Sequence, residues 1–221
     1  MHKPALAILL MLAATVAAAQ TPSQTKSAPK ASPAPAAKAD AFTLPERASG
    51  KKDAPIVMEV WTDFECPHCK ELYLHTLRRL MDDYCATGKV YLIHRDFPLQ
   101  GHVHAREAAR WADAAATIGK YEEVTEALFS NQEVWSVSGN IEPVVAAVLR
   151  PADLQKVKQV MKEHSAEIDA AIEKDVFLGA QTQVNQTPTT KLTEKGVILS
   201  VSPGNYPYAT LKSYLDSQLS K

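Results

Sequence analysis

The chain has 221 residues, with 24 Lys and Arg against 25 Asp and Glu, and a hydrophobic content of 46%. These proportions are ordinary for a globular protein and exclude a collagen-like or a wholly disordered chain. The near balance of charge gives no electrostatic support to nucleic-acid binding, so we expect no nucleic acid among the partners. Three cysteines are too few for a small domain stapled by disulfides, yet they need an explanation.

The first 19 residues have the features of a cleaved secretory signal. Lys3 is followed by an apolar run over residues 5–19, which ends in three alanines. Small residues at that place suit a signal peptidase, and the run is shorter than the roughly 20 apolar residues that span a bilayer. We therefore predict a signal peptide over 1–19 and a periplasmic or secreted location.

Residues 20–40 are rich in Ala, Pro, Ser and Lys and contain no large apolar side chain. Such a stretch cannot bury enough surface to offset the entropy lost on ordering, so we predict a flexible linker. Residues 41–221 remain, which is enough chain for one domain with a substantial core.

The folded region begins with an alternation of strand and helix. The β-rich run 56–61 predicts a strand, and residues 90–97 predict a second one. Between them, apolar residues at helical spacing from Lys70 to Tyr84 predict a helix that ends at Gly88. Strand, helix and strand within about 40 residues predict a βαβ unit with parallel strands and a right-handed crossover.

The rest of the chain is predicted to be mostly helical, with a hairpin near its end. Apolar spacing predicts helices over 104–117, 121–130, 141–149 and 152–173, and a shorter one over 177–184. The runs 189–192 and 197–201 flank a turn at 193–196 and predict a hairpin, and 208–219 predicts a closing amphipathic helix. The predicted fold class is α/β, a small sheet flanked by helices with a helical block inserted at about 102–175.

The motif Cys66-Pro67-His68-Cys69 lies where the first strand gives way to the helix. At a helix N-terminus, unpaired N–H groups and the helix dipole favour a negative charge, which lowers the pKa of a thiol. Pro67 fits the first turn because its missing N–H loses no partner. Cys69 lies on the same face and can form a redox-active disulfide with Cys66. His68 can donate to the Cys66 sulfur or add positive charge beside it, and both effects favour the reduced form.

Two other interpretations of the motif are weaker. A purely structural disulfide of this spacing closes too small a loop to stabilise the fold much. Two thiolates and an imidazole can bind zinc or copper, as in a copper carrier, but no second Cys-x-x-Cys motif lies near it. His102 and His104 could join such a site only if the fold brings them over. We therefore favour a redox pair, with no metal and no cofactor besides the two cysteines.

The motif after a strand, the inserted helices, and Thr187-Pro188 before a hairpin together resemble the thioredoxin superfamily. Within it, the chain is similar to the DsbA-type thiol–disulfide oxidoreductases of the bacterial cell envelope, over residues 42–219. Further matching pieces are residues 62–65, 94–99, 119–121 and 127–129. The resemblance implies a thioredoxin fold, with a small mixed sheet flanked by helices and a helical insertion.

The resemblance also implies roles for individual residues. Cys66 is then the nucleophile and Cys69 the resolving thiol, while Pro188 is cis and faces the pair, and Thr187 offers backbone contacts to an extended substrate. Many family members carry a buried acid six residues before the first cysteine, where this chain has Val60. Strand alternation points the neighbouring Glu59 to the opposite face, so we assign Glu59 no catalytic role and expect it to be partly exposed.

The function that we predict is that of an exported dithiol oxidase, which introduces disulfides into unfolded or newly secreted proteins and is reset by a membrane or soluble redox partner. A reductase or isomerase of the same fold is the alternative within this enzyme class. A metal carrier and a chaperone-like domain that binds extended chains along Pro188 are alternatives outside it. Isomerase-type relatives commonly dimerise through an added N-terminal domain, and residues 20–40 are too short and polar to form one, so we expect a monomer.

Cys85 is the odd cysteine. It lies about 16 residues beyond Cys69, or roughly four helical turns, which is too far for a disulfide with either cysteine of the motif. We interpret it as a buried side chain, with an exposed thiol that links two chains as the alternative. We expect the scattered histidines to be structural or exposed and the tryptophans to pack in the core; these residues are His75, His94, His102, His104, His164, Trp61, Trp111 and Trp135.

Overall fold

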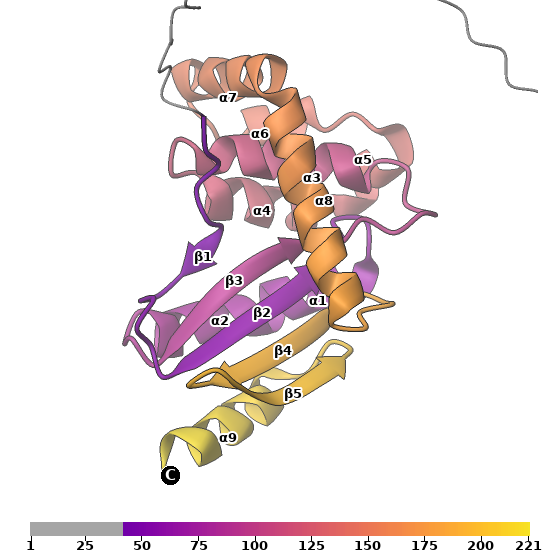
Figure 1. The fold of residues 1–221 in the computed structure, drawn as a ribbon. Coiled ribbons are helices and arrows are strands. Elements are labelled where there is room, and N and C mark those ends of the chain that lie inside the picture. The colour runs from indigo at the N-terminus through magenta and orange to yellow at the C-terminus, as the bar shows by residue number, and fades with distance from the viewer. Residues whose placement is uncertain (1–41) are drawn as a thin grey trace, which may run out of the picture. The chain divides into compact units, whose positions relative to one another are not determined.

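A five-stranded sheet in the order β1-β3-β2-β4-β5 lies at the centre of the fold (Figure 1). The computed structural model describes residues 42–221, so the predicted signal peptide (1–19) and linker (20–40) lie outside the described residues. The strands are Ala48–Ser49 (β1), Ile56–Thr62 (β2), Val90–Asp96 (β3), Thr189–Glu194 (β4) and Val197–Pro203 (β5). Over residues 42–221, no helix has both the length and the apolar content needed to cross a lipid bilayer.

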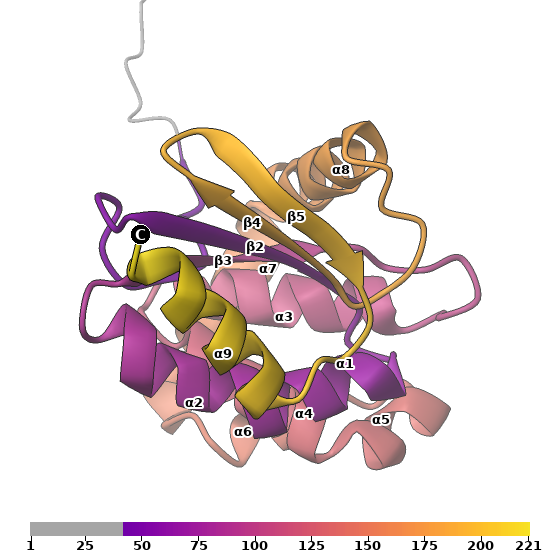
Figure 2. The ribbon, with the colours of Figure 1, turned by 90° about the horizontal axis from the view of Figure 1, so that it is seen from below.

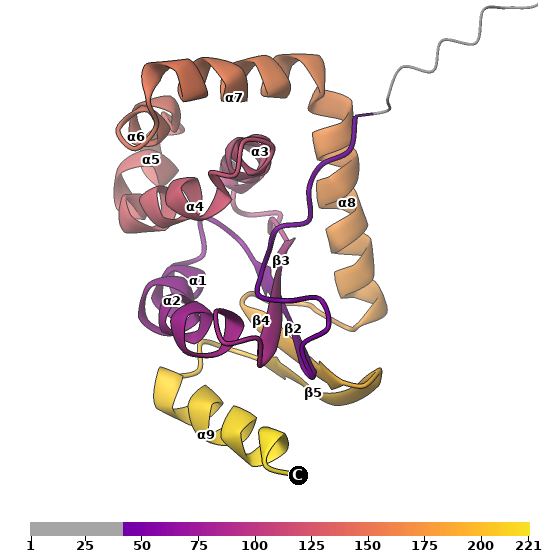
Figure 3. The ribbon, with the colours of Figure 1, turned by 90° about the vertical axis from the view of Figure 1, so that its left-hand side faces the viewer.

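The central strand β2 pairs in parallel with β3 and antiparallel with β4, so the sheet is mixed. Its apolar side chains Ile56, Met58 and Val60 are all 0% exposed, because helices cover the sheet face on which they lie. In Figure 3, α1, α2 and α9 lie on one face of the sheet and α8 lies along the other. The parallel pairing of β2 with β3 confirms the predicted βαβ unit.

The crossover from β2 to β3 is a nearly continuous helical run. It comprises α1 (Pro67–Leu72), η1 (Tyr73–Leu77), α2 (Arg78–Leu80) and η2 (Met81–Cys85). In η1 and η2 the turns are widened, since the N–H groups of Arg78 and Ala86 donate to carbonyls five residues earlier. Gly88, with φ of +75°, ends the run in the left-handed conformation that the sequence predicted.

The helical block connects β3 to β4, and most of it gathers at the end of the sheet toward which β2 and β3 point (Figure 1). Its helices are Ala105–Ala116 (α3), Tyr121–Ser130 (α4), Gln132–Ser138 (α5), Glu142–Ala146 (α6), Pro151–Glu163 (α7) and Ser165–Gln181 (α8). The block therefore continues to Gln181, beyond the predicted end near residue 175.

The predicted boundary between the helices over 152–173 and 177–184 is wrong. The chain turns at His164, between α7 and α8, and α8 then runs without a break to Gln181. Apolar periodicity could not mark this turn, because Val157 before it and Ile168 after it belong to the same buried core. The His164 ring stacks on Phe42 at a centroid distance of 3.6 Å, a contact 122 residues apart in the chain.

The hairpin β4–β5 closes on a two-residue turn, Lys195-Gly196, with φ of +47° and +82°. Positive φ at both central residues matches the twist of the two strands. The turn is therefore shorter than the predicted 193–196, and both strands are longer than expected. Beyond the hairpin, α9 (Tyr208–Leu219) contacts α2 and η1 (Figure 2).

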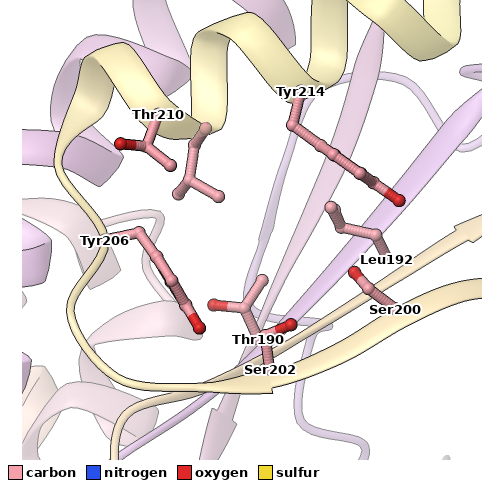
Figure 4. A pocket seen from close by; sticks show the side chains of 8 residues that line it. Thr190, Leu192, Ser200, Ser202, Tyr206, Thr210 and Tyr214 are labelled. Carbon is pink, nitrogen blue, oxygen red and sulfur yellow. The ribbon is translucent and has the colours of Figure 1, made fainter.

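A cavity of about 150 Å³ lies between α9 and the β4–β5 hairpin (Figure 4). It is lined by Thr190, Leu192, Ser200, Ser202, Tyr206, Thr210, Leu211 and Tyr214. These side chains are neutral, and none of them is a cysteine. The cavity is therefore separate from the redox motif and belongs to the packing of α9 on the sheet.

A buried ion cluster joins the N-terminal segment, the sheet and the helical block. Arg47, whose side chain is 9% exposed, pairs with Asp96 of β3, Asp113 of α3 and Asp175 of α8. Burial alone would lower the pKa of Arg47, but the three carboxyl groups hold it well above its ordinary value. The guanidinium therefore stays charged and links elements that are far apart in the chain.

We expect Arg47→Leu to destabilise the protein by about 3–5 kcal/mol, because it leaves buried carboxyl groups without their cation. Urea unfolding followed by tryptophan fluorescence measures this loss. Arg150→Ala is the matched control, since the Arg150 side chain is 81% exposed in its pair with Asp153 and should matter little. Equal unfolding midpoints for the two variants would contradict a structural role for the cluster.

Candidate active site

The redox motif begins shortly after β2, which ends at Thr62. Cys66 has an extended backbone (φ −74°, ψ 120°) and directly precedes α1, whose first residue is Pro67. The N–H groups of Cys69 and Lys70 donate to the Cys66 carbonyl at 3.1 and 3.2 Å. Cys66 thus occupies the helix N-terminus, as the sequence predicted.

The two sulfurs of the motif differ in burial and in charge. Cys66 is 5% exposed and Cys69 is 0% exposed, and both are free thiols in this structure. A hydrogen bond from the Cys69 thiol, against the opposing effect of burial, lowers the pKa of Cys66 from 9.0 to about 5. Burial, and then the neighbouring Cys66, raises the pKa of Cys69 well above 9.0. At neutral pH, Cys66 is therefore the thiolate and Cys69 keeps its proton.

The loop before β4 closes over the cysteines. The Thr187–Pro188 peptide bond is cis, as the family resemblance implied. The Cys66 sulfur lies 3.4 Å from the Thr187 carbonyl oxygen, to which it can donate only while it is protonated. The Thr187 hydroxyl is buried, without a hydrogen-bond partner among residues 42–221, and Thr187 contributes to lowering the pKa of Cys66. The structure thus brings Thr187 and Pro188 to the motif from 121 residues away.

His68 is exposed on the first turn of α1. Its main-chain N–H is among the groups that lower the pKa of Cys66, together with the N–H of Cys69. The helix N-terminus therefore acts on the sulfur through the backbone of His68. The proposed action of its imidazole stays a prediction.

Asp63 contacts both the motif and the loop that follows β3. Its side chain is 0% exposed, and its carboxylate accepts hydrogen bonds from the N–H groups of Glu65 and Leu99, each at 2.7 Å. One carboxylate oxygen lies 2.8 Å from Nδ1 of His102, and the Asp63 N–H donates to the Cys69 sulfur at 3.4 Å. Burial raises the pKa of Asp63, although these hydrogen bonds oppose the effect.

Asp63 and Gln132 had no predicted role, and His102 was considered only as a possible metal ligand or a structural or exposed histidine. The Gln132 amide donates to the carbonyls of Phe64 at 2.7 Å and of Cys66 at 3.1 Å, so it holds the motif from the side of α5. Asp63 stands in a matching piece of the family resemblance, which was the available signal. His102 and Gln132 lie 39 and 68 residues from their partners, and no local pattern marks such contacts.

The position that carries a buried acid in many family members is apolar here. Val60 is 0% exposed and packs in the core. Glu59 points to the other face, as predicted, where it pairs with Arg95 and Lys191 at 2.7 Å each. Its side chain is 13% exposed. Within residues 42–221, the hydrogen bonds and ion pairs that Glu59 makes are with Arg95 and Lys191 and not with the cysteines.

The other residues considered from the sequence are possible metal ligands, the third cysteine and the tryptophans. Within residues 42–221, no group of three or more His, Cys, Asp and Glu side chains is arranged to hold a metal ion. His104 contributes its main-chain N–H to Glu65 at 2.7 Å. Cys85 is 2% exposed and burial raises its pKa to about 11, which confirms its interpretation as a buried side chain. The tryptophans Trp61, Trp111 and Trp135 are also buried, as expected.

Comparison with known proteins gives matches over most of the chain. A family model described as Thioredoxin matches residues 43–217. The "Probable disulfide bond formation protein D" of Bacillus anthracis is 26% identical over 181 residues, which cover 80% of this chain and 79% of that protein. The "Na(+)/H(+) antiporter NhaA 1" of Mycolicibacterium gilvum is 31% identical over 150 residues, which cover 66% of this chain but 23% of the antiporter.

Two crystal structures are similar in fold. The thiol-disulfide exchange protein α-DsbA2 from Wolbachia pipientis has a TM-score of 0.65 and 22% identity, and the match covers 78% of this chain and 87% of that one. Oxidised BdbD from Bacillus subtilis has a TM-score of 0.64 and 20% identity, with coverage of 80% and 94%. These likenesses confirm the predicted fold class, α/β with a helical block inserted into a small mixed sheet.

We expect Cys66 to be alkylated first in the reduced protein, because its sulfur is both the more exposed of the pair and the charged one. The rate should rise through about pH 5 and stay level above it, following the pKa of Cys66. Mass spectrometry of iodoacetamide-treated protein at several pH values locates the label. Cys66→Ser is the control and should remain unlabelled under native conditions; preferential labelling of Cys69 or Cys85 would contradict the assignment.

Proposed function

This chain belongs to the thioredoxin family, as a thiol–disulfide oxidoreductase of the DsbA type, and we propose that it is an exported oxidase that introduces disulfides into unfolded or newly secreted proteins. The Cys66–Cys69 disulfide is the oxidant, and no cofactor besides these two cysteines takes part. The Bacillus anthracis relative, named for disulfide bond formation, supports this direction of the reaction.

The observation that carries the proposal is the separation of the two thiol pKa values. The pKa of Cys66 is lowered to about 5, mainly by the hydrogen bond from Cys69, whereas burial raises that of Cys69. A stabilised thiolate favours the reduced form of the pair and so makes the disulfide a stronger oxidant. A thiolate with a low pKa is also a good leaving group, which speeds release of the oxidised substrate.

The burial of the sulfurs favours one order of steps. A substrate thiolate attacks the sulfur of Cys66, the less buried of the two cysteines, and the sulfur of Cys69 leaves and becomes a thiol. A second substrate thiolate then attacks the substrate sulfur of the mixed disulfide, and the Cys66 thiolate leaves. The substrate has lost two electrons to the pair, and a redox partner removes them to reset it. The Thr187-Pro188 loop offers its backbone to an extended substrate beside Cys66.

The cellular setting is part of the same proposal. The apolar run over 5–19 supports export to the periplasm or the exterior, where disulfides persist. The substrates are then cysteine-containing proteins that have not yet folded. The redox partner is a membrane or soluble protein, and the enzyme works as a monomer.

The equilibrium potential of the Cys66–Cys69 couple tests the direction of the reaction. We expect a value near the oxidising end, about −120 mV, measured against glutathione buffers with the mature protein. A value near about −270 mV would instead indicate a reductase or an isomerase kept reduced by an electron donor. A Cys69→Ser variant, which cannot form the intramolecular disulfide, is the control for the measured couple.

A variant of His68 tests its imidazole. We expect His68→Leu to raise the pKa of Cys66 and make the couple more reducing, because it removes the imidazole as a hydrogen-bond donor to the sulfur while the backbone N–H stays. The potential and the pH profile of Cys66 alkylation measure the change. His75→Leu is the matched control, since the His75 side chain is 69% exposed in η1. An unchanged potential in His68→Leu would remove the imidazole from the mechanism.

A further inference from the structure

The charge on the Cys66 sulfur depends on groups in the first turn of α1. The Cys69 thiol and the main-chain N–H groups of Cys69 and His68 are among the groups that lower the pKa of Cys66. The sulfur lies beside them only while the Cys66 backbone keeps its extended conformation, with φ of −74° and ψ of 120°. A residue that holds this backbone in place therefore acts on the reactivity of the sulfur.

The chain reaches Cys66 through a tight turn that begins at Asp63. The Cys66 N–H donates to the Asp63 carbonyl at 3.1 Å, and Phe64 is the second residue of this turn. Phe64 is 1% exposed, and its ring stacks on Phe129 of α4 at a centroid distance of 4.9 Å. Within residues 42–221, no main-chain N–H donates to the Phe64 carbonyl. A buried carbonyl without a partner is destabilising, so this turn needs a donor from elsewhere in the fold.

Gln132 of α5 is that donor. Its side-chain amide donates to the Phe64 carbonyl at 2.7 Å and to the Cys66 carbonyl at 3.1 Å. One amide can make both bonds because its nitrogen carries two hydrogens. Gln132 is 4% exposed, and α5 is held in place by the buried Trp135, whose indole N–H donates to the Leu128 carbonyl at 2.7 Å. The helical block therefore sets the position of this amide.

Three consecutive peptide groups around Cys66 are thus fixed by hydrogen bonds. Gln132 holds the carbonyls of Phe64 and Cys66. Between them, the Asp63 carbonyl holds the N–H of Cys66. Each peptide group is planar, so holding three in a row leaves the two backbone dihedrals of Cys66 little freedom. The Cys66 carbonyl also accepts from the Cys69 N–H at 3.1 Å, so Gln132 donates to the oxygen at which α1 begins.

We propose that Gln132 is a positioning residue for thiol–disulfide exchange, which keeps the Cys66 sulfur beside the N–H groups of the first turn of α1. Its hydrogen bonds are to carbonyl oxygens and not to either sulfur, so it acts through the main chain. In the reduced protein this position stabilises the Cys66 thiolate, and during exchange it keeps that thiolate a good leaving group. The inference rests on exchange at this pair, as the proposed function does, but not on its direction.

Gln132→Met tests the proposal, because methionine has a side chain of similar length and no donor. We expect the midpoint of the pH profile of Cys66 alkylation to rise by about one pH unit, since the sulfur moves away from groups that stabilise its charge. The equilibrium constant with glutathione at neutral pH should become about tenfold less oxidising in parallel, because one unit of pKa corresponds to about tenfold in the stability of the thiolate. Iodoacetamide labelling of the reduced protein and titration with glutathione buffers measure the two changes.

Gln159→Met is the matched control, since it makes the same substitution at an exposed amide that binds Glu163 on α7. It should leave both the alkylation profile and the equilibrium constant unchanged. Gln132→Asn is the second variant, which serves if Gln132→Met does not fold. It keeps an amide but is one methylene shorter, so it cannot reach both carbonyls, and its profile should shift in the same direction. Urea unfolding of each variant reports any loss of stability separately.

The proposal fails if a folded variant of Gln132 keeps both the alkylation profile and the equilibrium constant of the unmodified protein. A loss of stability alone, with these two unchanged, would mean that Gln132 only packs α5 on the motif. The proposal also fails if Gln159→Met shifts the profile as much as Gln132→Met does. A wrong direction of the proposed function looks different, because the unmodified protein would then have a reducing potential and Gln132→Met would still shift relative to it.

Discussion

Burial of the Cys69 sulfur is the constraint on which the rest of the site depends. A sulfur with 0% exposure keeps its proton, and a protonated thiol can donate to its neighbour. That hydrogen bond is the largest cause of the low pKa of Cys66. The reactivity of the Cys66 sulfur is therefore produced by the inaccessibility of the Cys69 sulfur. The same burial creates the need for a proton at Cys69 whenever the disulfide opens or closes.

Several distant segments enclose the motif. The end of β2 supplies Asp63, α5 supplies Gln132, and the loop before β4 supplies Thr187, each with a hydrogen bond to a cysteine of the motif. The helical block must therefore be held firmly on the sheet. Arg47 does this by pairing with carboxylates from β3, α3 and α8.

Local patterns in the sequence predicted the elements that local forces decide. The βαβ unit, the left-handed Gly88 and the hairpin before α9 follow from hydrophobic spacing and turn residues. The division of α7 and α8 at His164 was missed because apolar spacing continues across it. The short helix α5 was missed too, since seven residues give little periodicity, and its buried Trp135 reflects tertiary packing.

The sequence by itself determined that two cysteines stand at the junction of a strand and a helix, because strand pattern, proline position and helical spacing are all local. It also placed Thr187-Pro188 beside them through a family resemblance. Only the tertiary structure decided which sulfur carries the charge, since that depends on burial from all sides. It alone joined Asp63 to His102, because a hydrogen bond between residues 39 positions apart depends on how the loop after β3 folds back over the end of β2.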